Sequence, residues 1–348
     1  MVKSMDQYIG KDIRPFIIAE MSGNHNKSLD RALAIVDAAA EAGAQAIKLQ
    51  TFTADTMTLD ITEGEFTIND SKSLWAGQAL HSLYQQAYTP WEWHAPIFER
   101  AREKGVLCFS SPFDETAVDF LETLDAPFYK IASFECIDLP LIRRAAQTGK
   151  PLIISTGMAT IAEIAEAVDT ARAAGCKELV LLKCTSNYPA SPENSNVRTI
   201  AHMRDLFGCE VGLSDHTMGI GAAVAAVAFG ATVIEKHFTL ARADGGVDSA
   251  FSLEPAELAS LVIETERAWQ SIGKIIYGPT AAEEKPRTRR RSLYIGADLE
   301  PGDVLTIDNL RRVRPGQGLP PKFYEMLLGR QVRKAVKKGT PVSWDLFD

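Results

Sequence analysis

The sequence predicts an α/β fold, a closed (β/α)8 TIM barrel followed by a small β-rich domain. Short apolar runs rich in β-branched residues alternate eight times with stretches of helical periodicity. This repetition is typical of a closed barrel rather than of an open doubly wound sheet. The chain has 348 residues, of which 46% are hydrophobic and 24% charged. It can therefore bury a large core, and the disordered and fibrous classes are excluded.

Each of the eight apolar runs has the length and composition of a buried strand, and helical stretches separate them. Strands joined by helices pair in parallel, as a barrel requires. The predicted strands are 16–20, 46–50, 106–111, 128–133, 151–156, 179–186, 210–216 and 232–238.

The stretches between the strands read as helices, clearest at 29–42, 90–104, 161–174 and 219–229. A glycine follows several of them, as is common where a helix ends. The segment 51–89 is longer than one helix and is expected to be an insertion after the second strand. The terminating glycines are Gly43, Gly105, Gly149, Gly175 and Gly230.

The expected organisation is a barrel over 1–278, a Pro-rich charged linker over 279–291 and a small β-rich domain over 292–348. Residues 285–348 hold 14 Lys and Arg against 7 Asp and Glu, a charge of +7, which leaves -15 for the rest of the chain. Such a basic tail could bind either nucleic acid or an acidic protein surface. The basic run 289–291 has no interleaved aromatic residues, so we expect no nucleic-acid partner.

Cysteine usage and hydropathy bear on where the protein works. The chain has five cysteines without the spacing of a disulfide framework, which favours a reducing compartment. No apolar leader is recognised, so we expect a cytoplasmic protein. Residues 217–234 carry no charge but are rich in Gly and Ala, and we read them as a buried helix and strand rather than a membrane span.

Polar side chains occur at the carboxyl end of every predicted strand, where the active sites of barrels are built. Two lysines among several hydroxyls suit an anion, most simply a phosphate, so we expect a phosphorylated substrate. The strand-end residues are Glu20, Lys48, Gln50, Ser110, Ser111, Lys130, Ser133, Ser155, Thr156, Thr185, Ser186, Ser214, His216, Glu235 and His237.

The two strand-end histidines, His216 and His237, are 21 residues apart, or one strand–helix unit. They are therefore expected at the tops of neighbouring strands, either as structural residues or as ligands of one metal ion. Two imidazoles without a carboxylate or thiolate would hold an exchangeable divalent ion that acts as a Lewis acid.

Motifs along the whole chain are similar to those of one enzyme family, the sialic acid synthases. The similar segments are IAEMSGNHN (18–26), AIKLQT (46–51), KIAS (130–133), STGM (155–158), GLSDHT (212–217) and EKHF (235–238). The resemblance implies a transferase with a synthase barrel and an antifreeze-like (SAF, β-clip) domain. Its reaction condenses phosphoenolpyruvate with an open-chain acylated amino sugar and releases phosphate.

The resemblance also implies roles for individual residues. Glu20, Lys130 and Glu135 would face the reacting centre, and His216 and His237 would hold Mn2+, with Mg2+ or Co2+ as alternatives. Arg314 would reach the sugar's acyl group from the partner subunit of a domain-swapped homodimer. The remaining substrate-binding residues would be Lys48, Ser111, Ser133, Ser155, Ser186, Tyr188, Ser214 and Asp248.

Four segments, 74–84, 89–94, 108–114 and 251–255, resemble the branch of the family that uses 2,4-diacetamido-2,4,6-trideoxy-L-altrose. The N-acetylneuraminate and legionaminate branches are the alternatives. Ser186 is followed by Asn187 where neuraminate synthases carry an asparagine after a Cys-Thr pair, so either side chain could meet the phosphate.

Two further alternatives concern the kind of protein. An aldolase on the same barrel would use Lys130 or Lys48 to form a Schiff base. A non-catalytic carbohydrate-binding protein would need only the small C-terminal domain. The polar residues gathered at eight strand ends favour an enzyme.

Overall fold

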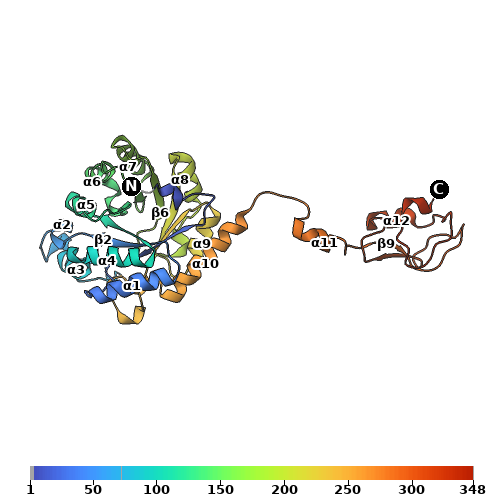
Figure 1. Cartoon of the computed structure of the whole chain (residues 1–348), viewed down its shortest axis with the longest axis horizontal. Helices are drawn as coiled ribbons and strands as arrows, with labels where there is room; N and C mark the ends of the chain where they lie inside the picture. The colour runs from blue at the N-terminus through green and yellow to red at the C-terminus, as the bar shows by residue number, and fades with distance from the viewer. Residues whose placement is uncertain (1–3, 72, 348) are drawn as a thin grey trace. The chain divides into compact units, whose positions relative to one another are not determined.

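The structure of the protein, a computed structural model, describes residues 4–71 and 73–347 (Figure 1). It divides into two compact units, Met1–Gly273 and Lys274–Asp348. In the first unit eight parallel strands close into a barrel in sequence order, which confirms the predicted TIM barrel. The strands are β1 (Phe16–Glu20), β2 (Ala46–Thr51), β3 (Leu107–Pro112), β4 (Tyr129–Ile131), β5 (Leu152–Ser155), β6 (Leu179–Cys184), β7 (Glu210–Asp215) and β8 (Val233–His237).

Helices surround the barrel and bury the outward-facing side of each strand (Figure 1). Local signals in the sequence set their ends. Thr160 and Glu163 form a reciprocal capping box at the start of α7, and Gly105 ends α4 in the left-handed conformation. The helices of this unit are α1 (Leu29–Glu41), α2 (Ala54–Met57), α3 (Leu80–Ala87), α4 (Trp91–Lys104), α5 (Glu115–Glu122), α6 (Leu139–Ala146), α7 (Ile161–Ala173), α8 (Thr199–Phe207), α9 (Gly221–Ala228) and α10 (Pro255–Ile272).

The insertion after β2 contains α2 and α3. The uncharged stretch 217–234 divides between α9 and the beginning of β8, as predicted. Across the described residues, no helix combines the length and apolar character needed to cross a membrane.

The barrel interior has an apolar layer that supports the polar strand ends above it. Phe16, Phe109 and Phe128 fill this layer together with Val233, and the short 3-10 turn η1 (Met5–Gln7) closes it from below. Phe128 packs edge-on against both other phenylalanines. Water is excluded from this layer, so the charged side chains at the strand ends can be solvated only from the mouth of the barrel.

The second unit has its own small core. Strand β9 (Ser292–Ile295) pairs antiparallel with β10 (Leu310–Val313), and α12 (Tyr324–Leu327) contributes Leu327 to the buried cluster. A short helix, α11 (Glu284–Arg287), precedes β9. The β-rich character predicted for this region is confirmed.

The barrel interior is packed tightly enough that one strand requires a glycine. Gly212 on β7 lies beside Val233 of β8, and a methyl group added to it would collide with the Val233 carbonyl oxygen and lie 2.7 Å from the Leu182 side chain. Carbon atoms at that separation repel strongly, and backbone cannot move aside without disturbing the strand pairing.

We therefore expect Gly212→Ala to lower the free energy of unfolding of the barrel by about 2 kcal/mol because the added methyl overpacks the interior. Urea titration followed by circular dichroism measures this change. Gly221→Ala is the matched control, since Gly221 begins α9 with nothing within 4 Å of the added carbon. Equal stability of the two variants would contradict the packing explanation.

Candidate active site

The polar residues at the strand ends are brought together by strand register. Glu20 pairs with Lys48 on one side and with His237 on the other, and Ser214 pairs with Glu235. Side chains alternate along a strand, so residues at matching positions of adjacent strands enter the barrel at the same level. The carboxyl ends of β1, β2, β7 and β8 thus form one polar layer.

Lys48 is the central cation of this layer. Its Nζ lies 3.1 Å from Glu20 Oε2, 3.2 Å from Glu235 Oε2 and 3.3 Å from Ser111 Oγ. The lysine side chain is only 5% exposed, so its charge depends on these carboxylates. Burial disfavours the ammonium, but Glu20 and Glu235 outweigh burial and raise the pKa of Lys48 above its usual value.

Lys130 is the second buried cation. Its Nζ donates hydrogen bonds to Ser155 Oγ at 2.6 Å and to the Ile131 carbonyl oxygen at 3.0 Å, and it lies 3.9 Å from Glu235 Oε1. Burial lowers the pKa of Lys130 to about 8, against the opposing effect of Glu235. The two lysines share Glu235, which also accepts a hydrogen bond from Ser214 at 2.8 Å.

The two carboxylates of the layer differ in charge state. Burial raises the pKa of Glu20 to about 7, although Lys48 opposes this change. Burial also works against ionisation of Glu235, but Lys130 and Lys48 outweigh it and hold its pKa near 2. Glu20 can therefore exchange a proton near neutral pH, while Glu235 remains a fixed negative charge.

Hydroxyl groups line the adjoining side of the mouth around Gly157. The Gly157 backbone N–H donates to Ser133 Oγ at 3.1 Å. A methyl group added to Gly157 would collide with Ser186 Oγ and lie 2.8 Å from Ser133 Oγ. The hydroxyls of Ser186 and Ser133 thus occupy the place that a side chain at position 157 would take, and two hydroxyls gathered in this way are suited to donate to anion oxygens.

The predicted histidine pair is brought together at the same mouth. The rings of His216 and His237 have centroids 5.3 Å apart, and the Tyr188 ring lies 4.4 Å from that of His216. Phe251 packs 4.9 Å from His237. Burial and nearby positive charge lower the pKa of His237 well below its usual value, so its imidazole is neutral.

The orientation of the two imidazoles fits metal binding. His216 Nδ1 donates to the Thr185 carbonyl oxygen at 3.0 Å, which in the neutral imidazole leaves the lone pair of Nε2 free. Burial opposes protonation of this ring, but Cys184, whose Sγ lies 3.8 Å from Nδ1, outweighs burial and raises the pKa of His216. His237 Nδ1 is buried without a hydrogen-bond partner and lies 3.7 Å from Asp248 Oδ2. No group of three or more His, Cys, Asp or Glu within 4–71 and 73–347 could hold a metal. Two imidazoles could, with water or substrate completing the coordination shell.

Asp248 and Glu135 lie at the edge of the layer. Ser22 Oγ donates to Asp248 Oδ2, and Gln50 Nε2 donates to Glu20 Oε1 at 2.9 Å and to Ser22 Oγ at 3.1 Å. Burial raises the pKa of Asp248. Glu135 lies on the 3-10 turn η3 (Phe134–Ile137). Burial raises its pKa to about 7, and its Oε2 has no hydrogen-bond partner.

Lys236 supports the site from the outer side of the barrel, and the sequence reasoning assigned it no role. Its Nζ donates to Asp215 Oδ2 at 2.8 Å and to the carbonyl oxygens of Thr217 and Gly219 at 2.6 and 2.7 Å. These acceptors lie on both sides of His216, so Lys236 holds the loop that carries this histidine. The sequence did contain a signal for this position. Lys236 lies between Glu235 and His237, and because side chains alternate along a strand, it must face the outer side of the barrel.

Gly157 was given no role from the sequence, and Glu235 was predicted only as one of the polar strand-end residues. Gly157 directly follows the strand-end pair Ser155-Thr156, and Glu235 lies at the strand level of Ser214. The need for a glycine at position 157 becomes apparent only when Ser133 and Ser186 converge on it from other strands.

Three strand-end residues do not enter the mouth, contrary to expectation. Ser110 Oγ lies 2.6 Å from Thr51 Oγ1 on the outer face, because Ser111 takes the inward position of that strand. Thr156 Oγ1 donates to the Leu182 carbonyl, and Thr185 Oγ1 donates to that of Asn194.

The structure also distinguishes Ser186 from Asn187 and locates Arg314. Ser186 lies against Gly157, whereas Asn187 is exposed on the following turn. Arg314 is exposed in the second unit, directly after β10.

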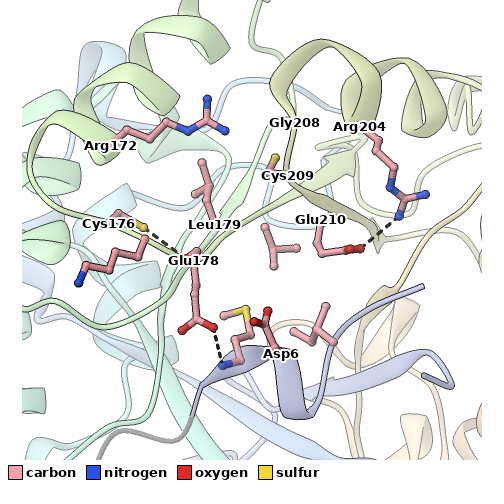
Figure 2. Close-up of a pocket in the computed structure, with 13 residues that line it drawn as sticks. Asp6, Arg172, Cys176, Glu178, Leu179, Arg204, Gly208, Cys209 and Glu210 are labelled. Atoms are coloured by element: carbon pink, nitrogen blue, oxygen red, sulfur yellow. Dashed lines mark hydrogen bonds and ion pairs between the residues drawn. The ribbon is translucent and has the colours of Figure 1, made fainter. Parts of the chain in front are cut away.

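A hollow of about 460 Å³ lies at the opposite end of the barrel, among the first residues of β6 and β7 (Figure 2). Three of its charged side chains already have partners. Arg204 lies 3.3 Å from Glu210, and Glu178 accepts hydrogen bonds from Ser4 and the backbone of Met5. These contacts join the N-terminal segment to the barrel floor, so the hollow has a structural explanation.

Comparisons with known proteins place the chain among synthases. The NeuB family model matches residues 35–277 and the SAF domain model matches 290–348. The pseudaminic acid synthase of Campylobacter jejuni subsp. jejuni serotype O:2 is 44% identical over 94% of this chain and 95% of that protein. The pseudaminic acid synthase of Helicobacter pylori is 41% identical over 95% of this chain and 97% of that protein.

A solved structure supports the same assignment. The N-acetylneuraminic acid synthetase of Leptospira borgpetersenii serovar Hardjo-bovis is 33% identical to this chain, with a TM-score of 0.72. The similarity covers 80% of this chain and 92% of that one. At 33% identity, the similarity is one of sequence as well as of fold.

The space beside Gly157 yields a prediction about anion binding. We expect Gly157→Ala to weaken the binding of inorganic phosphate about tenfold or more, because the methyl displaces Ser133 and Ser186. Isothermal titration calorimetry measures the affinity, and the melting temperature verifies that the fold is retained. Gly221→Ala again provides the control, and unchanged phosphate affinity in Gly157→Ala would show that the anion binds elsewhere.

Proposed function

The chain belongs to the NeuB family, and from that premise we propose that it catalyses the reaction of a pseudaminic acid synthase. Phosphoenolpyruvate, 2,4-diacetamido-2,4,6-trideoxy-L-altrose and water would give pseudaminic acid and phosphate. The observation that carries the proposal is one polar layer in which two buried lysines and several serines adjoin two imidazoles. An anion and a carbonyl compound could thus meet within one mouth.

The anionic substrate would bind at the lysine side of the layer. Lys48 and Lys130 would pair with the negative charges of the phosphate and carboxylate of phosphoenolpyruvate. Hydrogen bonds to these groups would be donated by the hydroxyls of Ser111, Ser133, Ser155, Ser186 and Ser214. Their existing contacts support this assignment, because Ser155 and Ser111 already accept hydrogen bonds from the lysines. Both lysines are buried, so an anion brought beside them is screened little by water.

The sugar would bind on the histidine side, with Tyr188 and Asp248 at its edge. A divalent ion, proposed as Mn2+ with Mg2+ or Co2+ as alternatives, would be held by His216 and His237 and would polarise the aldehyde as a Lewis acid. The lone pair left on His216 Nε2 and the unpartnered His237 Nδ1 support this assignment. Asp248 is close enough to His237 to orient a hydroxyl of the bound sugar beside that imidazole.

In the proposed reaction, C3 of phosphoenolpyruvate forms a bond to the aldehyde carbon, and the aldehyde oxygen takes up a proton. Water adds at C2 and passes one proton to a base. The tetrahedral centre then forms the C=O of the keto acid as its C–O bond to phosphate breaks, and the remaining hydroxyl proton leaves with the phosphate. Glu20 is the proposed base, because its pKa near 7 allows it to accept a proton beside Lys48. Glu135 has a similar pKa and is proposed to donate the proton that the aldehyde oxygen of the sugar takes up.

An aldolase that forms a Schiff base is the rival enzyme reaction. An imine requires a free amine, which the lowered pKa of Lys130 would favour, but Lys130 Nζ donates to Ser155 and Ile131 and lies close to Glu235, contacts that suit an ammonium beside a bound anion. Lys48 is held by two carboxylates that stabilise its charged form. Borohydride treatment with substrate should therefore leave no covalent adduct.

Arg314 is proposed to complete the site from a second subunit, in a domain-swapped homodimer. Its exposed position after β10 supports this role, as does the charge of +7 in the tail against -15 in the rest of the chain. A guanidinium group can donate hydrogen bonds to the carbonyl oxygen of an acyl group.

We also propose the cytoplasm as the location of the enzyme. All five cysteines are free, and four of them are buried. Free thiols are typical of proteins in reducing compartments.

The proposed reaction is tested by measuring phosphate release from phosphoenolpyruvate with a panel of acylated amino sugars. We expect the diacetamido-trideoxy-altrose to be used best, with N-acetylmannosamine and the legionaminate precursor much weaker. Activity should be lost with a chelator and return with Mn2+. In H2(18)O the released phosphate should stay unlabelled, because the C–O bond breaks. Labelled phosphate would refute C–O cleavage, and preference for another sugar would reassign the branch.

The proposed exchange of domains is tested by mixing two inactive variants. His237→Ala removes an imidazole from the barrel, and Arg314→Ala removes the guanidinium from the second unit. Hybrid dimers with exchanged domains would contain one intact site, so unfolding and refolding the mixture should restore about a quarter of wild-type activity. A mixture that remains inactive, although hybrid dimers are detected by mass spectrometry, would show that Arg314 serves its own subunit or no site.

A further inference from the structure

A second hollow, of about 610 Å³, opens beside the proposed sugar site. It is enclosed by the loops that follow β1, β2 and β8, which are neighbours in the barrel. Its walls include Gly23 and Val247, which adjoin Ser22 and Asp248 in sequence, and Ser22 donates a hydrogen bond to Asp248. We name this hollow the outer pocket, and the contact between Ser22 and Asp248 lies between it and the polar layer.

The insertion after β2 forms one wall of the outer pocket through Trp75. The indole Nε1 of Trp75 donates to the Val247 carbonyl oxygen at 3.0 Å, which joins the insertion to the loop after β8. The Trp75 ring lies 6.0 Å from that of Tyr188, which packs on His216. A molecule held at the histidines would therefore meet this wall as it extends outward.

The chemistry of the lining favours a neutral group. Among the described residues that line the outer pocket, Lys27 alone is charged, and its Nζ donates to the Tyr88 carbonyl at 2.7 Å and lies over the Tyr88 ring. Leu83 and Val247 add apolar surface. Among these lining residues there is no carboxylate, and the ammonium of Lys27 is already engaged by Tyr88, whereas the apolar surface would accommodate a methyl group.

Gln78 supplies an uncommitted amide at the pocket wall. Its side chain forms no hydrogen bond to the described residues, and its Oε1 is out of contact with water, so the Nε2 is the end of the amide that a ligand in the pocket can reach. An amide group without partners is costly, which is why such groups are rare unless a ligand satisfies them. The Nε2 of a primary amide donates, so it complements the C=O of another amide.

We propose that the outer pocket binds one of the two acetamido groups of the sugar, with Gln78 Nε2 donating to its acyl oxygen and Leu83, Trp75 and Val247 enclosing the methyl. This inference rests on the proposed function, which supplies the diacetamido sugar. It adds a specificity-determining subsite that is separate from the anion layer, from the histidine pair and from Arg314.

The test compares three sugars, the diacetamido substrate and two analogues in which one acetamido group is replaced by hydroxyl. In Gln78→Leu, which keeps the size of the side chain, we expect KM for the diacetamido sugar to rise about tenfold with little change in kcat or in KM for phosphoenolpyruvate. For the analogue that lacks the acetamido group bound in the outer pocket, the variant and wild type should have the same kcat/KM. Gln147→Leu, an exposed glutamine beyond α6, is the matched control.

The outcomes separate the subsite from the reaction. An equal loss with all three sugars, or no loss, would overturn the subsite while leaving the proposed reaction intact. If wild-type enzyme released no phosphate with any sugar, the proposed reaction would fail. Saturation-transfer NMR of the diacetamido sugar would then decide the subsite, since an unchanged methyl signal in Gln78→Leu contradicts it and a lost one supports it.

Discussion

The polar layer of the barrel depends on the buried ammonium of Lys48. This group lies between Glu20 and Glu235, and the three residues come from adjacent strands of the closed barrel. Taking these charges out of water is costly, and each is tolerated only because the others are present. Gln50 is oriented by Glu20, and Ser214 and Lys130 are oriented by Glu235. The remaining polar groups of the mouth are thus arranged around this one interaction.

The same interaction separates the properties of two carboxylates with the same chemistry. Glu235 faces two ammonium groups and stays ionised, whereas Glu20 contacts only the ammonium of Lys48 and has a pKa near neutrality. The barrel thereby presents a fixed charge and a proton acceptor within a few ångströms of a single lysine. The difference arises from position in the layer rather than from residue type.

Much of the architecture could be predicted because strands and helices leave periodic patterns. The run around Ile153 and that around Val180 are apolar throughout, as buried parallel strands are, and both are strands of the barrel. Ser110 was misplaced for a related reason. Adjacent side chains of a strand face opposite sides, so Ser110 and Ser111 could not both enter the mouth.

Contacts between distant loops could not be read from periodicity. Trp75 lies in a long insertion with no repeating pattern, and its bond to Val247 joins residues 172 positions apart in the chain. The uncommitted amide of Gln78 is likewise visible only once its neighbours are known. Such features depend on how irregular segments pack against one another, for which the sequence has no simple signal.

Lys236 has a consequence for how this site could be transferred to another barrel. Its ammonium ties Asp215 to the carbonyls of Thr217 and Gly219, so the turn carrying His216 is shaped from the outer face of the neighbouring strand. Copying the two histidines alone onto a foreign scaffold would leave that turn free to relax. The smallest portable unit is therefore a two-strand cassette, with its outward lysine and aspartate included.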